Sequence, residues 1–159
     1  MNWQQVVADP NLQDLPYKIE LNQWGQIVMT PARIVHGRHQ ATICALLTDL
    51  LRNKGEVVTE CAIQTNKGTK VADVAWFSIA RWEQVKDEFD SSIAPEICVE
   101  IISPGNSTGE MKTKRKLYFA AGASEVWICN AKGHVKFYTQ TEEISTSALA
   151  PAFPSVITI

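Results

Sequence analysis

Two strand-like runs of the chain are each interrupted by one acidic residue, and this pattern limits the folds open to the sequence. Asp73 lies in Val-Ala-Asp-Val-Ala-Trp within the run 69–78, and Glu100 lies in Ile-Cys-Val-Glu-Ile-Ile within 96–103. A buried carboxylate costs free energy unless a cation or hydrogen-bond donors pair with it. Two interpretations are open: each acid faces solvent from an edge strand, or both converge from neighbouring strands on one hard cation. The second interpretation predicts a Mg²⁺ site, since proteins hold Mg²⁺ through one or two carboxylates plus water and phosphate.

Apolar periodicity places these runs in a mixed α/β chain. The expected strands are 17–21 with 27–30 as an N-terminal hairpin, 56–64 with 69–78 as an antiparallel pair, 96–103, and 125–129 with 134–138 as a last hairpin. The expected helices are 38–53, a short one within 79–90, and 110–121, and a short apolar segment ends the chain at 156–159. Without the ends, the order is helix, three strands, helix, strand. That order predicts a sheet with helices packed against it.

Composition narrows the class of protein. The length of 159 residues suits one domain, 1–159, and the fractions of 45% hydrophobic and 20% charged residues are ordinary for a globular protein. No apolar run approaches the roughly 20 residues that cross a bilayer, and the N-terminus shows no export signal, so the expected location is cytoplasmic, away from membranes. The four cysteines stand singly among apolar residues, which predicts buried thiols and argues against a zinc site.

The net charge of −2 argues against a strongly basic nucleic-acid binder, but one local cluster is basic. It consists of Lys112, Lys114, Arg115 and Lys116. In the expected helix 110–121, Lys114 shares a face with apolar residues, whereas Lys112 and Lys116 fall on the opposite face. Lys114 either extends past its neighbours to solvent or points inward, where it needs an anionic partner such as Asp73, Glu100 or a bound phosphate.

Three further polar residues are candidates for the same site. His39 lies near the start of the helix 38–53 and is either a site residue or a structural histidine. Glu60 interrupts a strand and Glu20 the N-terminal hairpin, so both are candidates for a supporting or metal-linked role. Position is the only argument for these three.

The chain contains an ordered set of motifs: His39 before a leucine-rich helix, Ala72-Asp73-Val74-Ala75, Glu-x-x-Ser-Pro from Glu100, Lys-x-x-x-Tyr from Lys114 followed by Gly122, and Glu125-Val126-Trp127. This set resembles the Uma-type putative restriction endonuclease family of the PD-(D/E)XK nuclease superfamily. The resemblance covers nearly the whole chain and implies a restriction endonuclease-like core of order αβββαβ. It further implies hydrolysis of DNA phosphodiester bonds with Mg²⁺, for which Mn²⁺ substitutes, and a homodimer. By resemblance, Asp73 and Glu100 hold the metal, and Lys114 and His39 are catalytic residues beside them.

The chain departs from the superfamily pattern at two positions. Ala72 replaces the proline before the aspartate, which leaves the carboxylate in place. Ile102 stands where the lysine of Glu-x-Lys belongs and cannot replace it, so the resemblance assigns that role to Lys114. The alternative is a catalytically idle module of the same fold with a binding or regulatory role.

Overall fold

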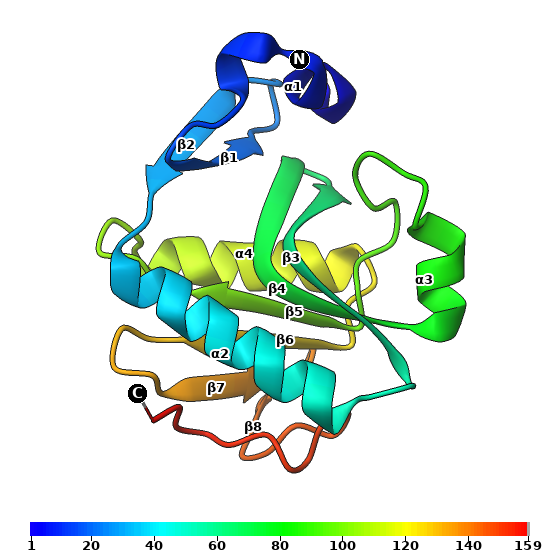
Figure 1. Cartoon of the computed structure of the whole chain (residues 1–159), viewed down its shortest axis with the longest axis vertical. Coiled ribbons are helices and arrows are strands. Elements are labelled where there is room, and N and C mark those ends of the chain that lie inside the picture. The colour runs from blue at the N-terminus through cyan, green and yellow to red at the C-terminus, as the bar shows by residue number, and fades with distance from the viewer. Residues whose placement is uncertain (159) are drawn as a thin grey trace.

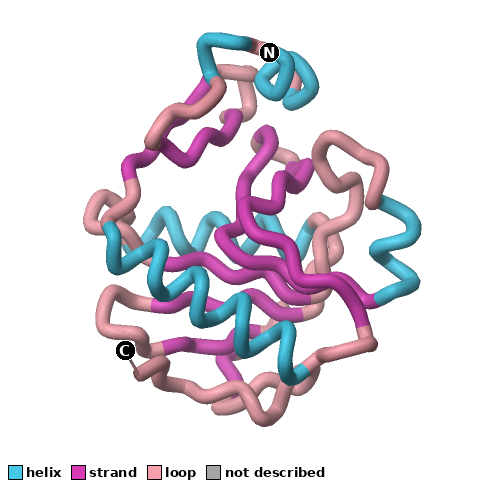
Figure 2. The backbone as a smooth tube through the Cα atoms, viewed as in Figure 1, coloured by secondary structure: helices cyan, strands magenta, loops and turns pink. Residues whose placement is uncertain are grey.

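The computed structural model describes residues 1–158, and its main sheet has six strands in the order β3-β4-β5-β6-β7-β8 (Figures 1 and 2). These strands are β3 (Gly55–Thr65), β4 (Gly68–Ser78), β5 (Ile97–Ile101), β6 (Glu125–Cys129), β7 (Val135–Tyr138) and β8 (Glu143–Ile144). Strands β5 and β6 pair in parallel, and the other neighbours pair antiparallel. A separate two-stranded sheet is formed by β1 (Tyr17–Leu21) and β2 (Ile27–Pro31). The predicted mixed α/β fold and its αβββαβ order are confirmed.

Two long helices cover opposite faces of the main sheet, α2 (Ile34–Leu50) on the near side and α4 (Thr108–Ala120) on the far side in Figure 1. Successive side chains of a strand point to opposite faces. Along β5, Val99 packs in the same buried cluster as Leu47 of α2, and Cys98 packs in the same cluster as Met111 of α4. This alternation places Glu100 on the face covered by α4.

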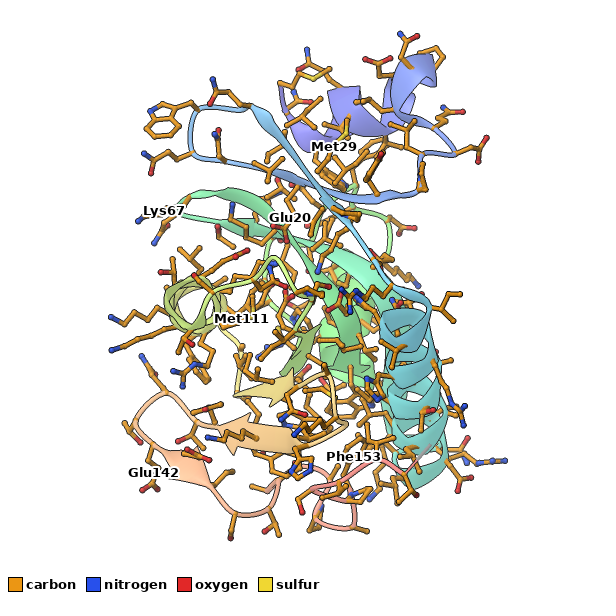
Figure 3. All side chains as sticks on the ribbon, turned by 90° about the vertical axis from the view of Figure 1, so that its left-hand side faces the viewer. Glu20, Met29, Lys67, Met111, Glu142 and Phe153 are labelled. Atoms are coloured by element: carbon orange, nitrogen blue, oxygen red, sulfur yellow. The ribbon has the colours of Figure 1, made fainter. Side chains whose placement is uncertain are left out.

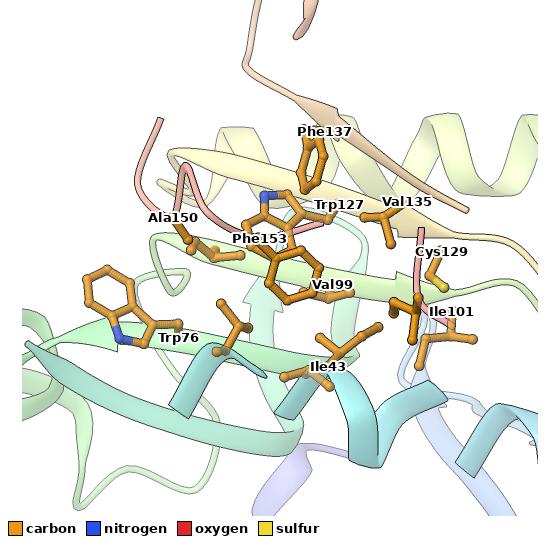
Figure 4. Close-up of a cluster of buried hydrophobic side chains, with 14 of the residues drawn as sticks. Ile43, Trp76, Val99, Ile101, Trp127, Cys129, Val135, Phe137, Ala150 and Phe153 are labelled. Atoms are coloured by element: carbon orange, nitrogen blue, oxygen red, sulfur yellow. The ribbon is translucent and has the colours of Figure 1, made fainter. Parts of the chain in front are cut away.

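Aromatic side chains fill the core between the sheet and the C-terminal segment (Figure 4). The Trp127 ring lies with its centroid 5.0 Å from that of Phe137 in an edge-to-face arrangement and 4.6 Å from that of Phe153. Such aromatic pairs contribute about 0.5–1.5 kcal/mol each beyond their buried area. Because the apolar side chains of β5 and β6 pack here, these strands form a rigid support for Glu100.

The predicted elements are present, with corrected bounds. The helix expected at 38–53 begins earlier, after Arg33 as its N-cap, and ends at Leu50, because Asn53 adopts a left-handed backbone with φ 64. The helix expected at 110–121 begins at Thr108, since the Ser107 hydroxyl accepts a hydrogen bond from Glu110 N at 3.1 Å. The helix within 79–90 is α3 (Ile79–Val85).

The sequence reading missed a short N-terminal helix, α1 (Trp3–Ala8), and a 3-10 turn over Pro10–Leu12. Helix α1 starts with a capping box in which Asn2 and Gln5 each bond the other's backbone N–H at 2.9 Å. Six residues are too few for a helical period to be recognised. At the other end, Ile157 N donates to Gly133 O at 2.8 Å, and residue 159 of the predicted apolar tail lies outside the described residues.

Three of the four cysteines are buried thiols, as predicted, and Cys44 is not fully buried. Cys61, Cys98 and Cys129 are buried, Cys44 is half-buried, and none of the four forms a disulfide among residues 1–158. Burial raises the pKa of the Cys61 and Cys129 thiols to about 12. Over the same residues, none of the helices combines the length and apolar character needed to cross a membrane.

The β1–β2 hairpin docks on the end of β4 through a few close contacts. Lys70 Nζ donates to Leu21 O at 2.8 Å, and Val71 N donates to Glu20 Oε1 at 2.9 Å. Gly68, with φ +84, permits the approach, because a Cβ atom built there would lie 2.4 Å from Leu21 O. These contacts turn β1 side chains toward the face of the sheet that α4 covers.

Glu125, which is 2% exposed, anchors the segment after β8 to the sheet. Its carboxylate accepts hydrogen bonds from Trp127 Nε1 at 2.8 Å, Ser147 Oγ at 2.7 Å, Ala148 N at 2.8 Å and Leu149 N at 3.1 Å. These four donors would lose a buried partner if the carboxylate were removed. Glu125 is therefore a structural residue.

We expect Glu125→Ala to lower the free energy of unfolding by about 3–5 kcal/mol, because buried donors left without partners cost about 1–3 kcal/mol each and the losses overlap. The matched control is Glu143→Ala, an exposed glutamate on β8, with an expected change within about 0.5 kcal/mol. Urea unfolding of both variants measures the difference. Equal stability of the two variants would contradict the anchoring role.

Candidate active site

Asp73 on β4 and Glu100 on β5 come from adjacent strands, as predicted. The antiparallel β4–β5 ladder ends at the pair Val74 and Val99. Asp73 and Glu100 are the next residue of each strand, so the two acids lie side by side at this end of the ladder. Asp73 is 0% exposed and Glu100 is 2% exposed. The interpretation that each acid faces solvent from an edge strand is therefore wrong, since β4 and β5 both have neighbours on each side.

One ammonium group lies between the two carboxylates. Lys18 Nζ, from β1, is 2.8 Å from Asp73 Oδ1 and 3.2 Å from Glu100 Oε2. These two oxygens are therefore separated by less than the roughly 8 Å at which two carboxylates could not share one ion. The convergence of the acids is confirmed, with a lysine at the point where they meet.

The second oxygen of Glu100 faces α4. Glu100 Oε1 accepts hydrogen bonds from Lys114 Nζ at 3.1 Å and from the Tyr118 hydroxyl at 2.5 Å. Lys114 and Tyr118 are four residues apart and share one helix face, which is buried as the spacing predicted. The prediction that Lys114 points inward is confirmed, and its nearest acids are Glu100 and Glu20.

Glu20 joins the hairpin to this cluster, at the junction between the hairpin and the body of the molecule in Figure 3. Glu20 Oε1 accepts hydrogen bonds from Lys114 Nζ at 2.7 Å and from Val71 N at 2.9 Å. Lys18 and Glu20 are two residues apart in β1, so their side chains leave the same face of the strand. The supporting position predicted for Glu20 agrees with these contacts.

Two further groups hold Asp73, one through its carboxylate and one through its backbone carbonyl. Asp73 Oδ2 accepts a hydrogen bond from Ile101 N at 2.6 Å, and Asp73 O accepts one from Gln40 Nε2 at 2.8 Å. Gln40 Nε2 also donates to Glu60 Oε1 at 2.6 Å. Glu60 lies opposite Asp73 and has a left-handed backbone, with φ 51°. Its backbone therefore leaves the β3–β4 ladder, and the Asp73 carbonyl can accept a hydrogen bond from Gln40 instead. Glu60 thus acts through Gln40 and does not contact the carboxylates.

A histidine other than the predicted one lies beside Asp73. His36 Nε2 is 3.3 Å from Asp73 Oδ1, without the alignment of a hydrogen bond, and its Nδ1 is 3.4 Å from Ser103 Oγ. His39 is buried, and a Cβ atom built on Gly133 would lie 3.4 Å from its Nε2. Neither ring nitrogen of His39 has a hydrogen-bond partner among residues 1–158. A catalytic role for His39 stays a prediction, and the contact with the acids belongs to His36.

Burial and mutual repulsion set the ionisation of the acids. Burial and the Glu100 carboxylate raise the pKa of Asp73 to about 7, against the opposing effect of Lys18. Burial also acts to raise the pKa of Glu100, but Lys114 and Lys18 outweigh it and hold that pKa below its ordinary value. Burial opposes the charge of Lys18, yet Glu100 and Asp73 hold its pKa above the ordinary range. The cluster therefore contains a glutamate and a lysine whose charged forms are favoured, and an aspartate whose pKa lies near neutral pH.

Two neighbouring groups stay neutral. Burial and the Glu100 carboxylate raise the pKa of Tyr118, so its hydroxyl remains a hydrogen-bond donor. Burial and the charge on Lys18 lower the pKa of His36, so its imidazole is uncharged at neutral pH.

The departure at Ile102 from the superfamily pattern has a structural consequence. Ile102 is half-buried against the apolar cluster under α4, and its N–H donates to Cys129 O at 2.8 Å. The cationic groups near Glu100 are Lys114 and Lys18 instead. Lys114 is buried and donates hydrogen bonds to the carboxylates of Glu20 and Glu100. It is therefore not part of a surface cluster with Lys112 and Lys116, which are exposed.

The residues present fit one divalent ion. Asp73 Oδ1 and Glu100 Oε2 already converge on the single Lys18 ammonium, which marks a position suited to a cation. Among residues 1–158, no three side chains of His, Cys, Asp or Glu are grouped to hold a metal. An ion at this position would therefore take two protein carboxylates and complete its shell with water and phosphate, which is the usual arrangement for Mg²⁺.

The sheet between α2 and α4, with acids on β4 and β5 and a lysine from α4, defines a restriction endonuclease-like fold. The chain belongs to the Uma2 family, described as "Putative restriction endonuclease", which matches residues 9–155. Membership supports nuclease activity as the class of function. A crystal structure of "a putative nuclease belonging to DUF820" from Anabaena variabilis ATCC 29413 is similar, with a TM-score of 0.69, 19% identity, and coverage of 91% of this chain and 83% of that one. No curated protein matches the chain.

Proposed function

We propose that the chain is a metal-dependent endonuclease that hydrolyses DNA phosphodiester bonds. The observation that carries the proposal is the convergence of Asp73 Oδ1 and Glu100 Oε2, from adjacent strands, on one cation position. Asp73 and Glu100 would hold Mg²⁺ or Mn²⁺ there. When bound, such an ion polarises the phosphate and lowers the pKa of a water molecule that attacks it.

The protein's own groups orient and stabilise around that position. Ile101 N–H holds Asp73 Oδ2, so that Oδ1 faces the cation position. The Tyr118 hydroxyl holds Glu100 Oε1, so that Oε2 faces the same position. Lys114, 3.1 Å from Glu100, orients the attacking water or stabilises the negative charge that develops on the phosphate. Glu20 holds Lys114 in this direction at 2.7 Å.

DNA is the proposed substrate because the family is described as "Putative restriction endonuclease" and restriction endonucleases cut DNA. A cavity of about 350 Å³ between α4 and the β6–β7 hairpin offers contacts for the phosphate backbone. Lys112, Arg115 and Lys136 line it, and none of its described lining residues is acidic. It shares Asn106 with the small cavity at the acids, so the two lie on either side of the β5–α4 loop. Two copies related by a two-fold axis would cut both strands of a duplex, which is the reason to propose a homodimer.

The first test is cleavage of supercoiled plasmid DNA by the purified chain. We expect nicked and linear products with Mg²⁺ or Mn²⁺ and none with excess chelator, because two carboxylates alone cannot activate water for attack on a phosphodiester. Re-addition of metal to the chelated sample is the control for damage by the chelator. Cleavage that persists in chelator, or no cleavage of single-stranded, duplex or supercoiled DNA with either metal, would contradict the proposal.

One observation favours a second candidate, a catalytically idle module of the same fold. The Lys18 ammonium already pairs with both acids, and Lys114 pairs with Glu100, so the buried carboxylates have cationic partners without a metal. In that case the chain would bind DNA through its basic cavity without cutting it. Metal binding distinguishes the two candidates, since an idle module of this kind has no divalent ion that depends on Asp73.

A further inference from the structure

Lys18 has contacts that the proposed function does not use. It belongs to the N-terminal hairpin, outside the main sheet, yet its Nζ bonds one oxygen of each acid. Its side chain is 12% exposed, and the two acids beside it are nearly fully buried. A buried lysine of this kind must have a partner, and these are the carboxylates assigned to the metal.

We propose that Lys18 is an internal competitor of the divalent ion, whose ammonium holds Asp73 and Glu100 until the metal displaces it. The inference rests on the proposed function and adds a control of metal affinity to it. Lys18 thereby becomes a residue that determines at which metal concentration the site fills.

The hydrogen bonds of the two acids leave no other place for an ion. Asp73 Oδ2 is held by Ile101 N, and Glu100 Oε1 is held by Lys114 and Tyr118. The oxygens that remain, Asp73 Oδ1 and Glu100 Oε2, are those that Lys18 contacts. An ammonium and a divalent cation repel each other at such distances, so the two cannot share these oxygens.

The size of the cavity beside Lys18 and Glu100 leads to the same conclusion. A cavity of about 20 Å³ is lined by residues that include Lys18, His36 and Glu100. That volume holds about one water molecule. A metal ion that keeps water and phosphate in its shell needs more room, and movement of the Lys18 side chain opens space at the oxygens where the ion would bind.

Competition between Lys18 and the ion relates the gain in metal affinity to the fraction of molecules in which Lys18 is detached from the acids. The apparent dissociation constant of a ligand equals its intrinsic value divided by the fraction of protein that is competent to bind. If Lys18 is detached in about one molecule in 10 to one in 100, removing its charge tightens metal binding by about 10- to 100-fold.

The experiment is calorimetric titration of the full chain with Mn²⁺, without DNA, for the wild type, Lys18→Gln and Lys67→Gln. Lys18→Gln keeps a hydrogen-bond donor and removes the charge. Lys67 is the matched control, because it loses the same charge, is exposed between β3 and β4, and has no ion pair with either acid among the described residues. We expect a gain of about 10-fold or more for Lys18→Gln and less than about threefold for Lys67→Gln.

The outcomes separate this inference from the proposed function. Equal affinities for wild type and Lys18→Gln, or equal gains in both lysine variants, overturn the competition. Asp73→Asn tests the site itself: if it binds Mn²⁺ as tightly as wild type, the ion is elsewhere and the proposed function fails. Should Lys18→Gln not fold, Lys18→Met replaces it, and the rise of its thermal midpoint with Mn²⁺ concentration reports the affinity. A rise no larger than that of the wild type again overturns the inference.

Discussion

Asp73→Ala is expected to reduce metal-dependent DNA cleavage by at least about 10³-fold, to the background of the assay. Asp73 Oδ1 and Glu100 Oε2 are the two carboxylate oxygens that converge on the cation position among the described residues. The remaining Glu100 would have to bind the ion alone, with weaker affinity and without a second group to fix its place. Initial rates of plasmid nicking at saturating Mn²⁺ measure the loss.

Two controls make the Asp73 result specific. Asp73→Asn can still accept the hydrogen bond from Ile101 N, so its loss of activity would report the charge and not the strand geometry. Asp49→Ala removes an exposed carboxylate of α2, whose partner is Arg52 at 3.0 Å, and should leave the rate unchanged. Undiminished cleavage by Asp73→Ala would indicate a contaminating nuclease or a different site.

Lys114→Met is expected to lower the cleavage rate by about 10²–10³-fold, the range for removing one preorganised stabilising group. Methionine keeps the apolar stem and removes the ammonium, which lies 3.1 Å from Glu100. The matched control is Lys116→Met, because Lys116 is exposed on the same helix. That variant should change little beyond salt-dependent DNA affinity. Equal rates for the two variants would remove Lys114 from the active site.

The structure changes the expected effect of Lys114→Met on folding. From the sequence, an inward lysine without a partner would make its removal neutral or stabilising. Lys114 has two partners, Glu20 and Glu100, so its removal leaves buried carboxylates with one cation fewer. Breaking a buried pair in this way costs about 3–5 kcal/mol of unfolding free energy.

A double variant separates folding from catalysis. Glu20→Gln together with Lys114→Met removes one charge of each sign, and the amide oxygen of the substituted glutamine can still accept the hydrogen bond from Val71 N. We expect this variant to recover most of the lost stability in a urea titration while cleavage stays low. Recovery of cleavage with stability would show that Lys114 supports the fold and does not act on the substrate.

Much of the fold was predictable because local patterns and long-range pairing agree in this chain. The β1–β2 and β6–β7 hairpins follow from turn-like stretches between short apolar strands, and the antiparallel β3–β4 pair follows in the same way. The helix bounds were less predictable, since they depend on caps such as Ser107 and on the left-handed backbone at Asn53.

The sequence by itself determined which charged side chains share a face with apolar residues, and left open whether the two acids and Lys114 are buried. Asp73 and Glu100 interrupt apolar strands, and Lys114 shares a helix face with Met111 and Tyr118. These positions follow from the periods of strand and helix, 2 and 3.6 residues, which assign each side chain to a face without any knowledge of the partner.

Only the tertiary structure decided which groups meet at those faces. Lys18 carries no sign of its role in the sequence, because a lysine in a short hairpin strand is ordinarily a surface residue. It reaches the acids since the hairpin docks on β4 through Lys70 and the close approach at Gly68. His36 rather than His39 lies beside Asp73 for a similar reason, the placement of α2 on the sheet. Contacts between segments 55 and 82 residues apart depend on how whole elements pack, which no local period encodes.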